Sequence, residues 1–156
     1  MGGTQTEGCI FGAGHALVEK LRARIEETVS SFIADLPADE AHPFLGRRPG
    51  RFRYAGAWSS LLRDQGFHVN HLHPEGWISS CYYVTVPAET DNPETRNGWI
   101  KFGEPSFELP LKNPIRRAVQ PIPGRLVLFP SYMWHGTVPL SAPSPRTTIA
   151  FDAVPQ

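Results

Sequence analysis

The sequence predicts a mainly β domain of the sandwich or barrel kind, braced by one helix near the N-terminus. The chain has 156 residues, which suffice for one domain with a proper core but not for two ordinary ones. Its 16 prolines and 14 glycines fall between short runs rich in β-branched and aromatic residues, a pattern typical of short strands joined by turns. One early segment instead repeats apolar residues every four positions. We therefore expect one domain over residues 1–156.

The helix is expected over about residues 15–36. Charged side chains fill the positions between apolar residues that recur every four positions. These apolar residues are Leu17, Leu21, Ile25, Val29 and Ile33. Pro37 should end the helix, because the residue before a proline disfavours the helical conformation. A helix with one apolar stripe must cover another apolar surface, so we expect this helix to brace the following sheet and to carry no chemistry.

The strands are expected between about residues 51 and 153. They span Phe52–Leu62, Phe67–His73, Ile78–Val86, Trp99–Phe102, Ala118–Gln120, Arg125–Phe129 and Thr147–Ala153. Short strands at regular spacing, separated by Gly and Pro, favour a sandwich or barrel. The loops Pro87–Asn97 and Gly103–Pro114 are expected to line the mouth of that barrel.

The charge balance excludes some classes of partner. Lys plus Arg and Asp plus Glu number 15 each, so no global field draws in nucleic acid or an anionic membrane. The sequence has no run of apolar residues long enough to span a bilayer and no secretory signal pattern. With only two cysteines as well, we expect a cytoplasmic protein and a structural role for Cys81.

The histidines are concentrated in a pattern that suits a metal. His68, His71 and His73 lie within six residues, and His135 stands far downstream. Residues two apart in a strand face the same side, so His71 and His73 should present two imidazoles together. His68 should face the other side, and we expect that it is not a ligand. Imidazole suits Fe, Cu, Ni and Zn, and a pair plus His135 leaves open positions on such an ion.

Several motifs together resemble those of the 2-oxoglutarate- and Fe(II)-dependent oxygenases. They are Asn70-x-His-x-His-Pro74, Phe129-Pro-Ser131 leading to His135, and Arg146-x-Thr148 eleven residues after His135. The resemblance runs from about Trp58 to Phe151 and extends to the oxygenase module found after tetratricopeptide repeats, which shares Gly2-Gly-Thr-Gln-Thr6.

The resemblance implies a fold and site residues. The fold would be a double-stranded β-helix, a cupin-like jelly roll. His71 and His135 would be metal ligands, and Arg146 with Thr148 would bind the far carboxylate of 2-oxoglutarate, a planar anion that suits a guanidinium. Tyr83 matches the tyrosine that often assists that carboxylate. Arg146 is therefore grouped with the three histidines as a catalytic candidate.

One departure from the family pattern concerns His73, which stands where most of the superfamily has an Asp or Glu ligand. Three interpretations remain open. His73 is the third ligand, or it lies beyond the metal and Glu75 or a water completes the set, or the site binds metal without turnover. Facing and spacing favour the first interpretation, with His71, His73 and His135 as the metal ligands.

The activity implied is that of a non-haem Fe(II) dioxygenase of the hydroxylase type. Oxidative decarboxylation of 2-oxoglutarate by O2 would be coupled to oxidation of a substrate that the sequence does not identify. Asn70 and Ser131 flank the ligands and are expected among the cofactor-binding residues, because either could hold an imidazole by a hydrogen bond. Trp77, Trp134 and Phe129 are candidates for a dry wall, with core packing as the alternative for each.

Two other functions are compatible with the sequence. A cupin-type metalloenzyme would use the same histidines without 2-oxoglutarate, and a metal-binding jelly-roll interaction module would lack turnover. Arg146 favours the oxygenase over the cupin-type enzyme, because nothing in the cupin pattern requires Arg-x-Thr after the last histidine. The resemblance also implies that the chain can be the catalytic end of a longer protein with N-terminal tetratricopeptide repeats.

Overall fold

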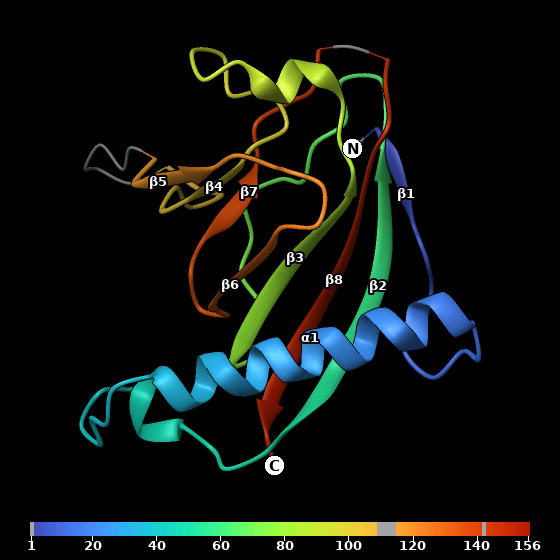
Figure 1. Ribbon diagram of the computed structural model, residues 1–156. Coiled ribbons are helices and arrows are strands. Elements are labelled where there is room, and N and C mark those ends of the chain that lie inside the picture. Colours follow the sequence, from blue (N-terminus) through green and yellow to red (C-terminus); the bar gives the residue numbers. More distant parts are fainter. Residues whose placement is uncertain (1, 109–114, 142) are drawn as a thin grey trace.

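The computed structural model describes residues 2–108, 115–141 and 143–156, and within them the strands form two antiparallel sheets (Figure 1). The larger sheet has the order β1-β2-β8-β3-β6, and the smaller one β5-β4-β7. The strands are β1 (Gly3–Gln5), β2 (Phe52–Leu62), β3 (Ile78–Thr85), β4 (Ile100–Phe102), β5 (Arg117–Val119), β6 (Leu126–Pro130), β7 (His135–Thr137) and β8 (Arg146–Pro155). The helices are α1 (Ala16–Asp35) and two short 3-10 turns, η1 (Leu45–Arg47) and η2 (Ala88–Asp91). The prediction of a mainly β jelly roll with one bracing helix is confirmed.

Strand β8 lies at the centre of the larger sheet, between β2 and β3. Because side chains alternate along a strand, β8 presents two different faces. Ile149, Phe151 and Ala153 belong to the main hydrophobic core. Arg146 and Thr148 instead line a cavity on the opposite side of the sheet. One strand therefore forms part of the core with one face and part of the cavity wall with the other.

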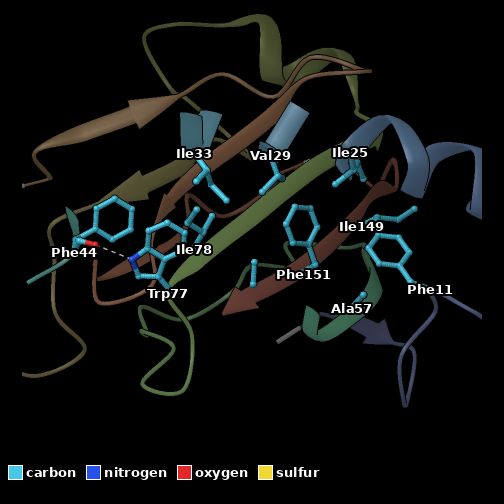
Figure 2. Close-up of a cluster of buried hydrophobic side chains, with 11 residues drawn as sticks. Phe11, Ile25, Val29, Ile33, Phe44, Ala57, Trp77, Ile78, Ile149 and Phe151 are labelled. Atoms are coloured by element: carbon cyan, nitrogen blue, oxygen red, sulfur yellow. Dashed lines mark hydrogen bonds between the residues drawn. The ribbon is translucent and has the colours of Figure 1, made fainter. Parts of the chain in front are cut away.

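Helix α1 packs on the core face of the larger sheet (Figures 1 and 2). Ile25, Val29 and Ile33 are 0–7% exposed and point toward the sheet (Figure 2). Leu17 belongs to the same sequence stripe but is 69% exposed, so the predicted stripe is wrong at that position. It lies in the first turn of the helix, at the end of the stripe. The helix is a brace, as expected from its spacing.

The segment that follows α1 is joined to the sheet by an aromatic contact. The indole of Trp77 stacks on Phe44 with ring centroids 4.9 Å apart, and its Nε1 donates to the carbonyl of Phe44 at 2.9 Å (Figure 2). Trp77 is 2% exposed. Of the two roles considered for Trp77, the structure shows core packing, and the residue does not line the cavity.

Most predicted strands agree with the structure to within one or two residues, but Phe67–His73 is wrong. Only His71 of that segment pairs as a bridge, with His135. The main chain of residue 68 meets residue 137 and that of His71 meets His135, so three residues oppose two and regular alternation is broken. The three-residue strands β1 and β7 were missed, because neither contains an apolar side chain that would indicate a strand.

The predicted loops differ from expectation. Pro87–Asn97 contains η2, where Thr90 is fully buried and its carbonyl accepts the indole N–H of Trp99 at 2.7 Å. Part of Gly103–Pro114, residues 109–114, lies outside the described residues. Neither loop contributes to the cavity lining in the part of the chain that the structure describes. Among the described helices, none has the length and apolar character needed to cross a membrane.

Candidate metal centre

A cavity of about 240 Å³ opens between the two sheets. Its wall combines residues of the larger sheet with residues of β4, β7 and the segment before β3. The lining residues include Trp58, Ser60, His68, His71, His73, Cys81, Phe129, His135, Thr137, Arg146 and Thr148. The predicted histidine ligands and the predicted arginine thus share one cavity, although up to 75 residues separate them along the chain.

The cavity brings His71, His73 and His135 together. One ring nitrogen from each lies within 4.8 Å of the others. Ring centroids are 4.2 Å apart for His71 and His135, 5.0 Å for His71 and His73, and 5.1 Å for His73 and His135. The backbones of His71 and His135 exchange two N–H···O bonds of 2.9 Å, which fixes their separation. A single ion can contact all three imidazoles after small ring movements.

Main-chain carbonyls orient two of the rings. Nδ1 of His71 lies 2.7 Å from the carbonyl oxygen of Val69, and Nδ1 of His135 lies 2.9 Å from that of Met133. A carbonyl oxygen only accepts, so Nδ1 carries the proton in both rings. The Nε2 lone pair is then free, which is the form that binds a metal.

The third ring has a different partner. Nδ1 of His73 lies 2.6 Å from Oδ2 of Asp152 on β8. The indole of Trp58 stacks against the same imidazole, with centroids 5.8 Å apart and planes 18° apart. Neither residue was expected at the site from the sequence. Asp152 lies six residues after Arg146 in the same strand, so strand alternation alone could have placed it on the cavity side.

Burial favours the neutral form of three imidazoles that line the cavity, those of His68, His71 and His135. Desolvation lowers the pKa of His135 to about 3, and it also lowers the pKa of His71. His68 has its pKa lowered to about 4 by burial and, to a smaller degree, by the nearby Arg146. Neutral imidazoles are the species that coordinate a metal, so protons compete weakly at this site.

Arg146 is a buried cation without an anionic partner among the described residues. It is 1% exposed, and its Nε and Nη1 make no hydrogen bond there. Nη2 donates weakly to the sulfur of Cys81 at 3.9 Å, and the guanidinium lies 4.9 Å from the ring centroid of Tyr83. Burying unpaired charged donors is costly, so the site is suited to an incoming carboxylate.

Tyr83 and Thr148 lie beside this arginine. The two residues are register partners across β3 and β8, and both are buried. The Tyr83 hydroxyl has no hydrogen-bond partner among the described residues, and burial raises its pKa. Thr148 lines the cavity, whereas Tyr83 contacts Arg146 but does not line the cavity. The arrangement places two further polar groups near the guanidinium.

The structure does not place Asn70 and Ser131 where an imidazole needs them. Nδ2 of Asn70 donates to Glu104 at 2.8 Å, and Ser131 is a hydrogen-bond partner of Ser79 at 2.9 Å. Every Nδ1 of the trio has another partner. The idea that either side chain holds an imidazole was therefore wrong, and neither residue lines the cavity.

His68 was expected on the opposite face but lines the cavity, because the segment before His71 is irregular. Its Nδ1 lies 3.3 Å from the hydroxyl of Thr137. It does not belong to the group of three that could share an ion among the described residues. Phe129 lies 4.6 Å from the His135 ring and forms part of the wall, as expected. Trp134 instead packs edge-on against Phe107 and does not line the cavity.

Comparison with known proteins gives a family match. The family model described as "Putative 2OG-Fe(II) oxygenase" matches residues 56–152. That range holds the three clustered histidines, Arg146 and Asp152. No curated protein sequence matches the chain.

Solved structures share the fold at low sequence identity. The viral collagen prolyl hydroxylase of Paramecium Bursaria Chlorella virus-1, in its 2OG complex, is 11% identical over 99% of this chain and 80% of that one, with a TM-score of 0.64. A Pseudomonas putida prolyl-4-hydroxylase is 14% identical over 94% and 69%, with a TM-score of 0.61. HygX from Streptomyces hygroscopicus with nickel, 2-oxoglutarate and hygromycin B is 15% identical over 99% and 83%, with a TM-score of 0.51. The chain spans 48% of a longer Burkholderia pseudomallei oxidoreductase of the 2OG-Fe(II) oxygenase family.

Proposed function

The chain belongs to the 2OG-Fe(II) oxygenase family, and we propose that it acts as a 2-oxoglutarate- and Fe(II)-dependent oxygenase with His71, His73 and His135 as its metal ligands. Arg146, with Thr148 and Tyr83, is the proposed site for the far carboxylate of 2-oxoglutarate. When bound, iron supplies the activation of O2 that couples decarboxylation of 2-oxoglutarate to oxidation of a substrate.

The single observation that carries the co-substrate site is the unpaired guanidinium. Two of the Arg146 donors have no partner among the described residues, although the side chain is 1% exposed. A carboxylate accepts two parallel N–H bonds from a guanidinium and neutralises its charge. The cationic group shares its cavity with the histidine trio, as a bifunctional anion bound to both would require.

His73 is proposed as a ligand in place of the usual carboxylate. Its ring lies with the other two, and its Nδ1 is engaged by Asp152, which leaves Nε2 for the ion. Glu75, the alternative considered from the sequence, is exposed and does not line the cavity. Three nitrogen ligands leave further positions free for a bidentate co-substrate and O2.

Aromatic side chains pack against the proposed metal ligands and against Arg146. Trp58 stacks on His73, and Phe129 packs against His135, so both limit the access of water to the imidazoles. The buried tyrosine ring under the guanidinium stabilises its positive charge through a cation–π contact. The chain thus orients its ligands and excludes water.

The wider setting is also a proposal. Residues 1–156 are proposed to form one oxygenase domain, acting in the cytoplasm on a substrate other than nucleic acid. Both cysteines are free, which is in keeping with a reducing compartment. The sequence resemblance to modules that follow tetratricopeptide repeats supports a place in a longer protein.

The test is an anaerobic titration of metal-free protein with Fe(II) and 2-oxoglutarate. Wild type should develop the visible charge-transfer band of the iron chelate. Arg146→Ala should require at least tenfold more 2-oxoglutarate to reach the same band, because the far carboxylate loses its partner. Arg125→Ala is the matched control, since Arg125 already donates to the Gln120 carbonyl at 2.7 Å.

Three results would contradict the proposal. Bound iron without a band in wild type would favour a metalloenzyme or binding module that does not use 2-oxoglutarate. An equal response of Arg146→Ala and Arg125→Ala would remove Arg146 from the site. A wild-type band without succinate formation after O2 is admitted, tested over long incubation, would favour a module without turnover.

A further inference from the structure

Asp152 connects His73 to a chain of hydrogen bonds that continues through Ser79 to Ser131. Its Oδ2 lies 2.6 Å from Nδ1 of His73, and its Oδ1 lies 2.6 Å from the hydroxyl of Ser79. The Ser79 hydroxyl also lies 2.9 Å from that of Ser131. A hydroxyl has one proton and a carboxylate only accepts, so Ser79 donates to Asp152 and accepts from Ser131. Both carboxylate oxygens are therefore held, and the orientation of the carboxylate is fixed.

The charge of Asp152 has no arginine or lysine partner among the salt bridges of the described residues. Its side chain is 15% exposed, and that of His73 is 16% exposed. Desolvation of a carboxylate is costly unless positive charge is near. Among the described residues, the only basic group within ion-pair distance is the His73 imidazole, which also belongs to the candidate metal centre.

The three imidazoles are not equivalent in this respect. His71 and His135 donate to neutral main-chain carbonyls, whereas His73 donates to an anion. His73 is also the residue that occupies the position of the superfamily's carboxylate ligand. The chain has therefore placed a carboxylate one hydrogen bond beyond the position where a carboxylate ligand would otherwise bind.

We propose that Asp152 is a positioning residue that supplies, through His73, the negative charge and ring orientation that a carboxylate ligand would give to the metal. An anionic acceptor at Nδ1 makes Nε2 a stronger electron donor and fixes the tautomer and the ring rotation. Stacking of Trp58 limits the tilt of the same ring. This inference rests on the proposed metal site, and it adds a residue that the oxygenase resemblance did not identify.

The test uses Co(II) alone, without 2-oxoglutarate and without oxygen. Metal-free wild type, Asp152→Ala and Asp152→Asn are titrated in competition with a fluorescent chelator. Asp152→Ala should bind Co(II) about 10- to 100-fold more weakly, the effect that loss of an outer partner of a ligand typically has. Asp152→Asn keeps a hydrogen-bond acceptor but removes the charge, so its loss should be smaller but above threefold.

Two control variants make the result specific. Glu104→Gln removes a carboxylate that bonds Asn70 and contacts no imidazole nitrogen, so it should bind Co(II) within twofold of wild type. His135→Ala removes a proposed ligand and should lose affinity by more than any Asp152 variant. Far-UV circular dichroism and thermal melting establish that each variant is folded. If Asp152→Ala does not fold, Asp152→Asn and Ser79→Ala carry the comparison, and Ser79→Ala should weaken Co(II) binding severalfold.

A spectroscopic measurement separates tuning of the metal from mere support of the fold. At saturating Fe(II) and 2-oxoglutarate, the charge-transfer band of Asp152→Asn should lie at shorter wavelength than that of wild type, because a less electron-rich iron gives up charge at higher energy. Wild-type Co(II) affinity in the Asp152 variants, or lowered thermal stability with unchanged affinity, would overturn the inference and leave the trio intact. Wild-type affinity in His135→Ala would instead overturn the proposed metal site itself.

Discussion

Replacement of Arg146 by methionine should make the metal-free protein more stable while it weakens binding of 2-oxoglutarate. The guanidinium is 1% exposed and leaves two N–H donors without partners among the described residues. Each unsatisfied buried donor costs about 1–3 kcal/mol. Methionine has a similar length and no donors. The substitution also removes the cation–π contact between the guanidinium and Tyr83. This loss of about 0.5–2 kcal/mol offsets part of the stability gained by removing the unsatisfied donors.

The expected net gain is roughly 2 kcal/mol in the free energy of unfolding, or about 4–8 °C in Tm. The assay is urea unfolding of the metal-free protein, extrapolated linearly to water. Arg125→Met is the control, and it should lose about 1 kcal/mol, because the donor of Arg125 to the Gln120 carbonyl is satisfied.

The second half of the prediction concerns the co-substrate. Loss of one partner of a buried charge pair costs about 2–5 kcal/mol, which is about 30-fold to several thousand-fold in affinity. With metal bound and oxygen excluded, 2-oxoglutarate at 100 times the wild-type Kd should stabilise wild type by about 2.7 kcal/mol and the variant by at most about 0.9 kcal/mol. A folded Arg146→Met protein with a lower free energy of unfolding would refute the reasoning, because the guanidinium would then be satisfied within the fold.

Two further predictions concern pH and the core. Burial holds the pKa of His135 at about 3 and of His68 at about 4, below the unfolded value of about 6.5. Between pH 6.5 and 5 only the unfolded chain takes up these protons. The free energy of unfolding of the metal-free protein should therefore decrease as the pH is lowered, by up to about 1.4 kcal/mol per pH unit for each of the two histidines. Urea unfolding across that pH range checks this, and a flat profile would contradict it. Phe151→Ala, at a fully buried core position, should cost about 3–5 kcal/mol in the same assay, against under about 0.5 kcal/mol for Leu17→Ala on the surface. Equal losses for these two variants would argue against the core described here.

The long helix and strands, and the pairing of His71 with His73, could be predicted from the sequence. The four-residue spacing of Ile25, Val29 and Ile33 defines a helix face that a sheet must cover, and the structure has that contact. His71 and His73 face one cavity because they remain two apart in extended chain. Arg146 could be placed only through the family resemblance, since no local pattern says that its strand runs beside the histidines.

The features that the sequence did not predict depend on contacts between distant segments. Asp152 reaches His73 across 79 residues, and Trp58 reaches the same ring from another strand. The failure at His68 has a local cause, because strand alternation assumes a regular ladder and one extra residue breaks it before His71. Such a bulge depends on the facing main chain and has no clear signature in a single sequence.

The two-faced strand β8 ties the assembly of the site to the choice of strand register. A shift of one residue against β2 would turn Ile149 and Phe151 into the cavity and send Arg146 and Asp152 against α1. Such a mispaired state would place apolar side chains in the polar cavity and two charged groups in the hydrophobic core, so it is heavily penalised. The register that packs Ile149 and Phe151 in the core therefore also places Arg146 and Asp152 on the cavity side. Correct packing of the core under α1 thus assembles this part of the site at the same time.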